Sequence, residues 1–194
     1  RRFTVRDVAL LLNALAKFGL RDQLLLRSLL PTLVRRITEK SKWEDLSLLA
    51  LSYARLTDPT QAVVFDRIVA SLTPRMDRID DGHTLSLLAC AFTRTATGRQ
   101  DASDEVEDGG SKPFAEDFQQ PLFLPEAEVG EVTSIAFVEV LMEQCERHIF
   151  SFRGSDVLHL CLALTNLIRS GNQDAIPPRL IPRLAKRLEA LYYE

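Results

Sequence analysis

The stretch Asp7-Val-Ala-Leu-Leu-Leu-Asn-Ala-Leu-Ala-Lys-Phe18 decides the fold, because close relatives of it recur along the chain. It aligns with residues 45–56, 84–94 and 156–167. The first two steps measure 38 and 39 residues, and the third measures 72, which is one repeat plus an insertion of about 33 residues. Self-similarity at such a period is typical of stacked helical units, each of which covers the apolar face of the next.

The spacing of apolar residues within this stretch predicts a helix. Val8, Leu11, Leu12, Leu15 and Phe18 fall at intervals of three and four residues, so they share one face. A second unit follows each copy. Residues 29–37 (LLPTLVRRI) match residues 180–188 (LIPRLAKRL) nearly residue for residue, and residues 68–76 match them more loosely. Each repeat is therefore expected to contain a first helix and a second, antiparallel helix.

The fold class that follows is all-α: an α-solenoid of about four antiparallel helix pairs, with one long acidic insertion. We expect a single domain over 1–194, with repeats at about 3–40, 41–78, 79–150 and 151–194, and an inserted loop at about 97–131. Hydrophobic residues make up 46% and charged residues 26%, which favours a globular chain over a disordered one. No apolar run is long enough to predict membrane insertion.

The net charge of −3 is divided unevenly. Residues 101–131 hold ten acids and one base, a charge of −9, so the remainder carries −3 + 9 = +6. We expect a basic folded part and an acidic surface loop. The chain begins at Arg1 without Met, so we also expect a processed or trimmed terminus from which any targeting peptide has been removed.

Several short signals mark helix ends. Thr4-x-x-Asp7 and Ser41-x-x-Glu44 read as capping boxes, in which side chains satisfy free N–H groups of the first turn. Asp58-Pro59 places an N-cap residue before a proline suited to the first helical position. Gly19 and Gly171 suit helix C-termini, where a positive φ is needed. The aligned Pro31 and Pro182 indicate a kink or a break in the second helices.

Small residues recur at two aligned positions of the first helices, where they would let neighbouring helices approach closely. The first row is Ala14, Ser52, Ala91 and Ala163, and the second row is Ala16, Ala54, Thr93 and Thr165.

No pattern of residues predicts catalysis, a metal, a cofactor or a small-molecule substrate. His83, His148 and His159 lie outside any metal-binding spacing, and Cys90, Cys145 and Cys161 form no C-x-x-C pair. We expect structural or solvated histidines and inert core thiols. A phosphate-binding glycine loop and a nucleophile elbow are also missing from the sequence.

A row of cations on the first helices is the candidate binding feature. Lys17, Arg55, Arg94 and Asn166 occupy one aligned slot in successive repeats. They lie on a polar stripe that also includes Asn13, with Ser47 and Ser86 as its expected equivalents. Such a row could follow a phosphate backbone. The alternative is that each of these basic side chains complements the dipole at the C-terminus of its own helix.

The second helices carry a further basic set for the same RNA-binding role: Arg35, Arg36, Arg183, Lys186 and Arg187. A solvated helix face is the alternative explanation. Aromatic side chains suited to base stacking are few, namely Trp43, Tyr192 and Tyr193, and Trp43 could equally pack at a helix start.

The string Asp7–Gly19, followed by a leucine-rich second helix, resembles the octotricopeptide and heptatricopeptide repeats. It is also similar to the helical part of RAP-domain and FAST kinase-like proteins. The resemblance covers most of the chain except the insertion. It implies an organellar RNA-binding protein, in the mitochondrial matrix or in a plastid, with a role in transcript processing or in a mitochondrial ribosome.

We therefore expect a non-catalytic helical-repeat protein of an organellar ribonucleoprotein, foremost a structural subunit of a mitochondrial ribosome that contacts rRNA and neighbouring proteins. Two alternatives stay open: an organellar RNA-processing factor, and a protein-binding accessory subunit of a mitochondrial respiratory or ATP-synthase complex. The acidic insertion and its apolar segment 121–125 favour the last of these.

Overall fold

The computed structural model describes residues 3–56, 60–97 and 130–193, with side chains described except at 95–97 and 130–134. Within these ranges the chain is all-α, with eight α-helices, short 3₁₀ turns and no strand. The helices are α1 Val5–Lys17, α2 Gln23–Arg36, α3 Trp43–Leu56, α4 Gln61–Leu72, α5 Gly82–Thr97, α6 Gly130–His148, α7 Gly154–Arg169 and α8 Leu180–Tyr193. The 3₁₀ turns are η1 Thr73–Arg78, η3 Ile149–Ser151 and η4 Gln173–Ala175.

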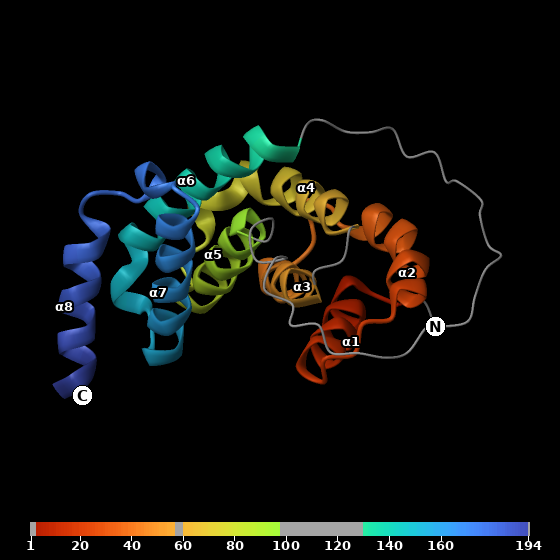
Figure 1. Cartoon of the computed structure of the whole chain (residues 1–194), viewed down its shortest axis with the longest axis horizontal. Coiled ribbons are helices and arrows are strands. Elements are labelled where there is room, and N and C mark those ends of the chain that lie inside the picture. The colour runs from red at the N-terminus through yellow and green to blue at the C-terminus, as the bar shows by residue number, and fades with distance from the viewer. Residues whose placement is uncertain (1–2, 57–59, 98–129, 194) are drawn as a thin grey trace, which may run out of the picture.

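The helices lie in two layers (Figure 1). The odd-numbered helices pack in chain order, α1 on α3, α3 on α5 and α5 on α7. The even-numbered helices follow the same order along the other layer, α2 on α4, α4 on α6 and α6 on α8. The two ends of the chain therefore lie at opposite ends of the molecule, as Figure 1 shows.

The helix ends confirm some of the expected caps and correct one. Thr4 and Asp7 form the predicted capping box, in which the backbone N–H of Asp7 donates to Thr4 Oγ1 over 3.2 Å. The box predicted at Ser41 and Glu44 is wrong, because α3 begins at Trp43 and Ser41 Oγ instead accepts from the backbone N–H of Thr38 over 3.1 Å. The predicted cap at Asp58-Pro59 lies outside the described residues.

The predictions for the two glycines are confirmed, whereas the two prolines do not share one role. Gly19 and Gly171 have φ of 67° and 74°, which confirms the predicted C-terminal turns after α1 and α7. Pro31 lies in the interior of α2, whereas Pro182 is the third residue of α8. Pro182 thus lies in the first turn of its helix, where its missing N–H would have no intrahelical acceptor, whereas Pro31 lies further inside α2, so the aligned prolines do not mark one common break.

The expected rows of small residues are buried only in part: Ala14 and Thr165, on the outermost odd helices, are exposed and Ala16 is half-buried. Ser52, Ala91 and Ala163 are fully buried, as are Ala54 and Thr93 within about one per cent. Behind this layer, the core continues into the even helices. The ring of Phe92 on α5 lies 4.6 Å from that of Phe65 on α4 and 4.7 Å from that of Phe137 on α6, measured between centroids.

An arginine within the even helix, or in the 3₁₀ turn that follows it, makes the same contact in three of the helix pairs. Each of these arginines donates to the carbonyl oxygen two residues before the odd helix of its own pair. Arg75 Nη2 reaches the oxygen of Ser41 over 2.6 Å, Arg187 Nε reaches that of Phe152 over 2.9 Å, and Arg36 Nη1 reaches that of Phe3. In the remaining pair, the carbonyl of Asp80 instead accepts from Ser151 Oγ over 3.3 Å.

The acidic insertion expected at 97–131 falls between α5 and α6, and residues 98–129 lie outside the described part of the chain. The expectation that it is a surface loop therefore stays a prediction.

Candidate nucleic-acid interface

The four residues of the expected RNA-binding row occupy matching places in the odd layer. Lys17, Arg55 and Arg94 each lie in the last turns of their helix, and Asn166 lies three residues before the end of α7. Lys17 and Arg94 are exposed, whereas Arg55 and Asn166 are half-buried. Because α1, α3, α5 and α7 pack in succession, the four side chains follow one another along one end of the layer.

The electrostatics of Cys90 show that two of these cations are neighbours. Burial raises the pKa of the Cys90 thiol, and the positive charges of Arg94 and Arg55 partly oppose that rise. Both guanidinium groups therefore lie close enough to Cys90 to favour its charged form. Because burial dominates, the thiol stays protonated near neutral pH and is no activated nucleophile.

The field of Arg55 extends further, to the face of α7. Burial is the main cause that lowers the pKa of His159, and the charges of Arg55 and His83 lower it further, while Asp156 opposes them. A cation on α3 thus acts on side chains of both α5 and α7. Positive charge from Arg55 therefore reaches the side of α3, α5 and α7 that carries Arg55, Cys90 and His159, which we call the free face.

One correction concerns the polar stripe expected on this face. Ser47 and Ser86 are buried to within about one per cent, and their hydroxyls donate back to the carbonyl oxygens of Glu44 and His83. The residues that align with Asn13 are instead Leu51 and Cys90, and both are nearly buried. On the free face, the apolar Leu51 and Cys90 therefore lie between the cations Arg55 and Arg94 at one end and His83 at the other.

At the other end of this face, a buried carboxylate links two helices. His83 Nδ1 on α5 lies 2.8 Å from Asp156 Oδ1 on α7, and Asp156 is 1% exposed. The same carboxylate caps α7, because the backbone N–H of Arg153 donates to its second oxygen over 2.9 Å. Sequence reasoning missed this pair. The one available signal was an aspartate at this aligned position in three of the four copies.

The basic set of the even helices divides into two groups. Arg35 and Lys186 are exposed. Arg36 and Arg187 make the carbonyl contacts described above, and Arg183 Nη1 donates to the carbonyl of Glu146 over 3.0 Å. These three guanidinium groups thus have intramolecular acceptors and hold helices together. Their expected contact with RNA stays a prediction.

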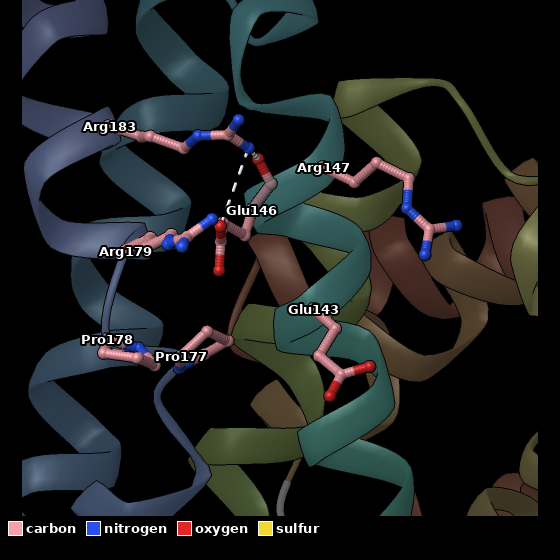
Figure 2. A pocket seen from close by; sticks show the side chains of 7 residues that line it. All are labelled: Glu143, Glu146, Arg147, Pro177, Pro178, Arg179 and Arg183. Carbon is pink, nitrogen blue, oxygen red and sulfur yellow. Dashed lines mark hydrogen bonds and ion pairs between the residues drawn. The ribbon is translucent and has the colours of Figure 1, made fainter.

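A shallow cleft lies between α6 and the start of α8 (Figure 2). Arg183 and Glu146 form an ion pair across it, with 3.6 Å between Nη1 and Oε1. Arg147 points away from Arg183, on the other side of α6 (Figure 2). Glu143 and Arg179 also line the cleft. Charges of both signs meet here, so the cleft favours neither anions nor cations.

The expected stacking aromatics do not join the basic row. Trp43 is half-buried and packs against the core, while Tyr192 and Tyr193 are exposed at the end of α8, with ring centroids 5.3 Å apart. Contact with RNA on the odd layer would therefore depend on phosphates more than on bases.

Among the described residues, no three His, Cys, Asp or Glu side chains gather in a way that could hold a metal ion. In the same ranges, no helix has the length and apolarity that crossing a membrane requires. Cys90 and Cys145 are buried thiols and Cys161 is a half-buried one.

No known family model matches the chain, and searches of curated proteins and of solved structures found no match.

Proposed function

We propose that this chain is a non-catalytic, RNA-binding helical-repeat protein of an organellar ribonucleoprotein, foremost a structural subunit of a mitochondrial ribosome. Its four helix pairs are the repeats of a short α-solenoid. The row Lys17, Arg55, Arg94 and Asn166 contacts the RNA backbone. The neighbouring subunits pack against its apolar surfaces.

Two observations support the repeat architecture. The odd helices stack on one another in chain order, and the even helices do the same. In addition, Arg36, Arg75 and Arg187 stand at aligned positions and donate to the carbonyl at the same place before their odd helix. Equivalent residues making equivalent contacts are what a true structural repeat requires.

The placement of Arg55 and Arg94 carries the proposal of RNA binding. Their charges act together on Cys90, and that of Arg55 also acts on His159 of α7. Packed helix axes lie roughly 8–10 Å apart, so one cation per helix makes a row spaced by about that distance. A flexible single strand can present successive phosphates to such a row.

The compartment and the particle rest on the resemblance to octotricopeptide and heptatricopeptide repeats. The charge of +6 outside residues 101–131 agrees with an RNA partner. An organellar RNA-processing factor would use the same row and is the nearest alternative.

A second candidate function has an observation of its own. Leu10, Phe18, Leu158 and Leu162 are exposed apolar residues on the outermost odd helices. Exposed apolar patches mark contacts with other proteins. This favours either the packing of the chain into a large particle or the role of an accessory subunit in a mitochondrial respiratory or ATP-synthase complex.

Affinity purification of the tagged chain from organelle extract, with and without RNase, tests the proposal. We expect rRNA and ribosomal proteins to co-purify, and we expect less RNA with the variant Lys17→Gln, Arg55→Gln, Arg94→Gln. A matched control replaces the exposed Arg27, Arg67 and Arg147 of the even helices by Gln. Recovery of an RNA-free membrane complex would contradict RNA binding and support the accessory-subunit role.

A further inference from the structure

The outer face of α7 is uncovered at the positions where its neighbour is buried. On α5, Ser86, Ala89 and Thr93 are fully buried, because α7 packs beside that helix. The aligned residues on α7 are Leu158, Cys161 and Thr165. Leu158 is 60% exposed, Thr165 is exposed and Cys161 is half-buried. We call these three residues, with the adjacent Leu162, the α7 end face.

The first helix of the layer shows the opposite half of the same interface. Ser52, Ala91 and Ala163 are fully buried against the preceding odd helix, and Leu56 on α3 is 3% exposed. Their counterparts on α1 are Ala14, which is exposed, and Phe18, which is 79% exposed. We call Leu10, Ala14 and Phe18 the α1 end face.

We propose that the α7 end face of one molecule binds the α1 end face of a second copy of this chain, head to tail. The two end faces correspond to the two sides of an interface that the chain already forms three times, between α1 and α3, α3 and α5, and α5 and α7. A second copy therefore offers each end face the kind of helix that covers the equivalent residues inside the molecule. The inference rests on the proposed repeats and is independent of RNA binding.

The chemistry of the two end faces supports contact rather than exposure to water. Leu158 and Leu162 are large aliphatic side chains one helical turn apart, and Phe18 is a large aromatic one. Repeat proteins that end in solvent require a polar outer face on the terminal repeat. Because the two end faces differ, the contact is heterologous and does not close on itself, so assemblies larger than dimers form as concentration rises.

The test blocks each end separately. The variant Leu158→Glu, Thr165→Glu blocks the α7 end face, and Ala14→Glu, Phe18→Glu blocks the α1 end face. We expect the wild-type mass in analytical ultracentrifugation to rise with concentration under reducing conditions. We expect each blocked variant alone to associate at least about tenfold more weakly. An equimolar mixture of the two should form a dimer and nothing larger, through the one intact face on each chain.

A matched control is Val140→Glu, Phe150→Glu, which places two acids on exposed apolar residues away from both end faces. It should associate as the wild type does. The alkylation rate of the half-buried Cys161 gives a second readout, and it should fall as wild-type association proceeds. All four chains are first checked for unchanged helix content by circular dichroism.

Three results would each overturn the proposal: a wild type that stays monomeric at about 1 mM, blocked variants that still self-associate, or a control that loses association as well. RNA affinity of Leu158→Glu, Thr165→Glu is measured in parallel. Retained RNA binding alongside a failed association test separates this proposal from the proposed function.

Discussion

Arg75 Nη2 lies 2.6 Å from the carbonyl oxygen of Ser41, a contact that ties the end of one helix pair to its beginning. The same guanidinium holds the carbonyl of Ser71 through Nε over 3.0 Å and the hydroxyl of Ser71 over 3.1 Å. Burial lowers the pKa of Arg75, but the group stays charged at physiological pH. Arg75 therefore satisfies three oxygen acceptors near the junction of α4 and α3.

Replacement of Arg75 by Ala should lower the free energy of unfolding. Hydrogen bonds to charged groups contribute roughly 1.5–3 kcal/mol, and the substitution leaves the Ser41 carbonyl without this donor. We expect a loss of about that size in urea unfolding followed at 222 nm. Arg67→Ala is the control, because Arg67 is exposed on the neighbouring helix α4 and surface changes cost about 0.5 kcal/mol or less. Equal losses in the two variants would show that the hydrogen bonds of Arg75 contribute nothing to stability.

Gly82→Ala should destabilise the protein, whereas Gly154→Ala should not. The two glycines are the first residues of α5 and α7 and occupy aligned positions. A Cβ on Gly82 would lie 2.6 Å from Cδ1 of the buried Phe152 and 3.1 Å from its Cα, while one on Gly154 meets nothing within 4 Å. Overpacking costs about 1–3 kcal/mol. Thermal unfolding of both variants checks this, and a Gly82→Ala protein as stable as Gly154→Ala would contradict the close packing of α5 on residue 152.

Asp81 should make stability depend on acid pH. Burial alone would raise its pKa, but hydrogen bonds from the hydroxyl and N–H of Thr84 and from the N–H of His83 outweigh this and lower it. A carboxyl whose pKa is lower in the folded state stabilises fully above its unfolded value, about 3.9, and that contribution is lost as pH falls through the folded pKa. Asp81→Asn should therefore cost about 0.3–1 kcal/mol at pH 7, and this cost should shrink as pH falls below the unfolded value.

The check is the difference in unfolding free energy between wild type and Asp81→Asn at several pH values. Asp66→Asn, an exposed change on α4, serves as the control. A wild-type advantage over Asp81→Asn that is constant from pH 7 to pH 2 would contradict the role of this carboxylate as a charged cap.

His159 should titrate below the ordinary histidine pKa of about 6.5, mainly because it is partly buried and in addition because Arg55 lies near it. Protonation is disfavoured in the folded state, so His159 removes stability as pH falls below the unfolded pKa. Arg55→Gln should raise the pKa of His159 without restoring it fully, since burial remains. NMR titration of the imidazole measures the shift. Arg27→Gln, on a different layer, should leave the pKa of His159 unchanged. An unchanged pKa of His159 in Arg55→Gln would contradict the position of Arg55 near this imidazole.

The helices could be predicted because they depend on local pattern. The repeated string beginning at Asp7 predicted α1, and the structure places that helix at Val5–Lys17, within two residues at each end. Thr4, Gly19 and Gly171 act through local backbone geometry, so their roles could be read from short motifs. The cap at Ser41 failed because Lys42 intervenes before the helix, and spacing alone does not reveal such a shift.

The long-range contacts could not be predicted from the same patterns. His83 and Asp156 are 73 residues apart, and their link depends on how α5 and α7 are packed. The sequence predicted RNA contacts for Arg36 and Arg187, which stay predictions, and it carried no signal that both side chains also donate to backbone carbonyls. Their acceptors are backbone carbonyls, which every residue carries. The misplacement of Ser47 and Ser86 came from aligning them with Asn13, four residues away from its true counterparts Leu51 and Cys90.

The measurement that tests the central claim most directly is the salt dependence of RNA affinity. Fluorescence anisotropy with a single-stranded RNA compares three proteins. They are the wild type, the triple row variant (Lys17→Gln, Arg55→Gln, Arg94→Gln) and the triple control variant (Arg27→Gln, Arg67→Gln, Arg147→Gln). Each lost phosphate contact lowers the slope of log K against log salt by about 0.7 for a single strand, so the row variant should lose about 2 from the slope and bind more weakly, while the control stays close to wild type. Equal effects of the two triple variants, or no RNA binding by the wild type, would contradict the claim that this row binds RNA.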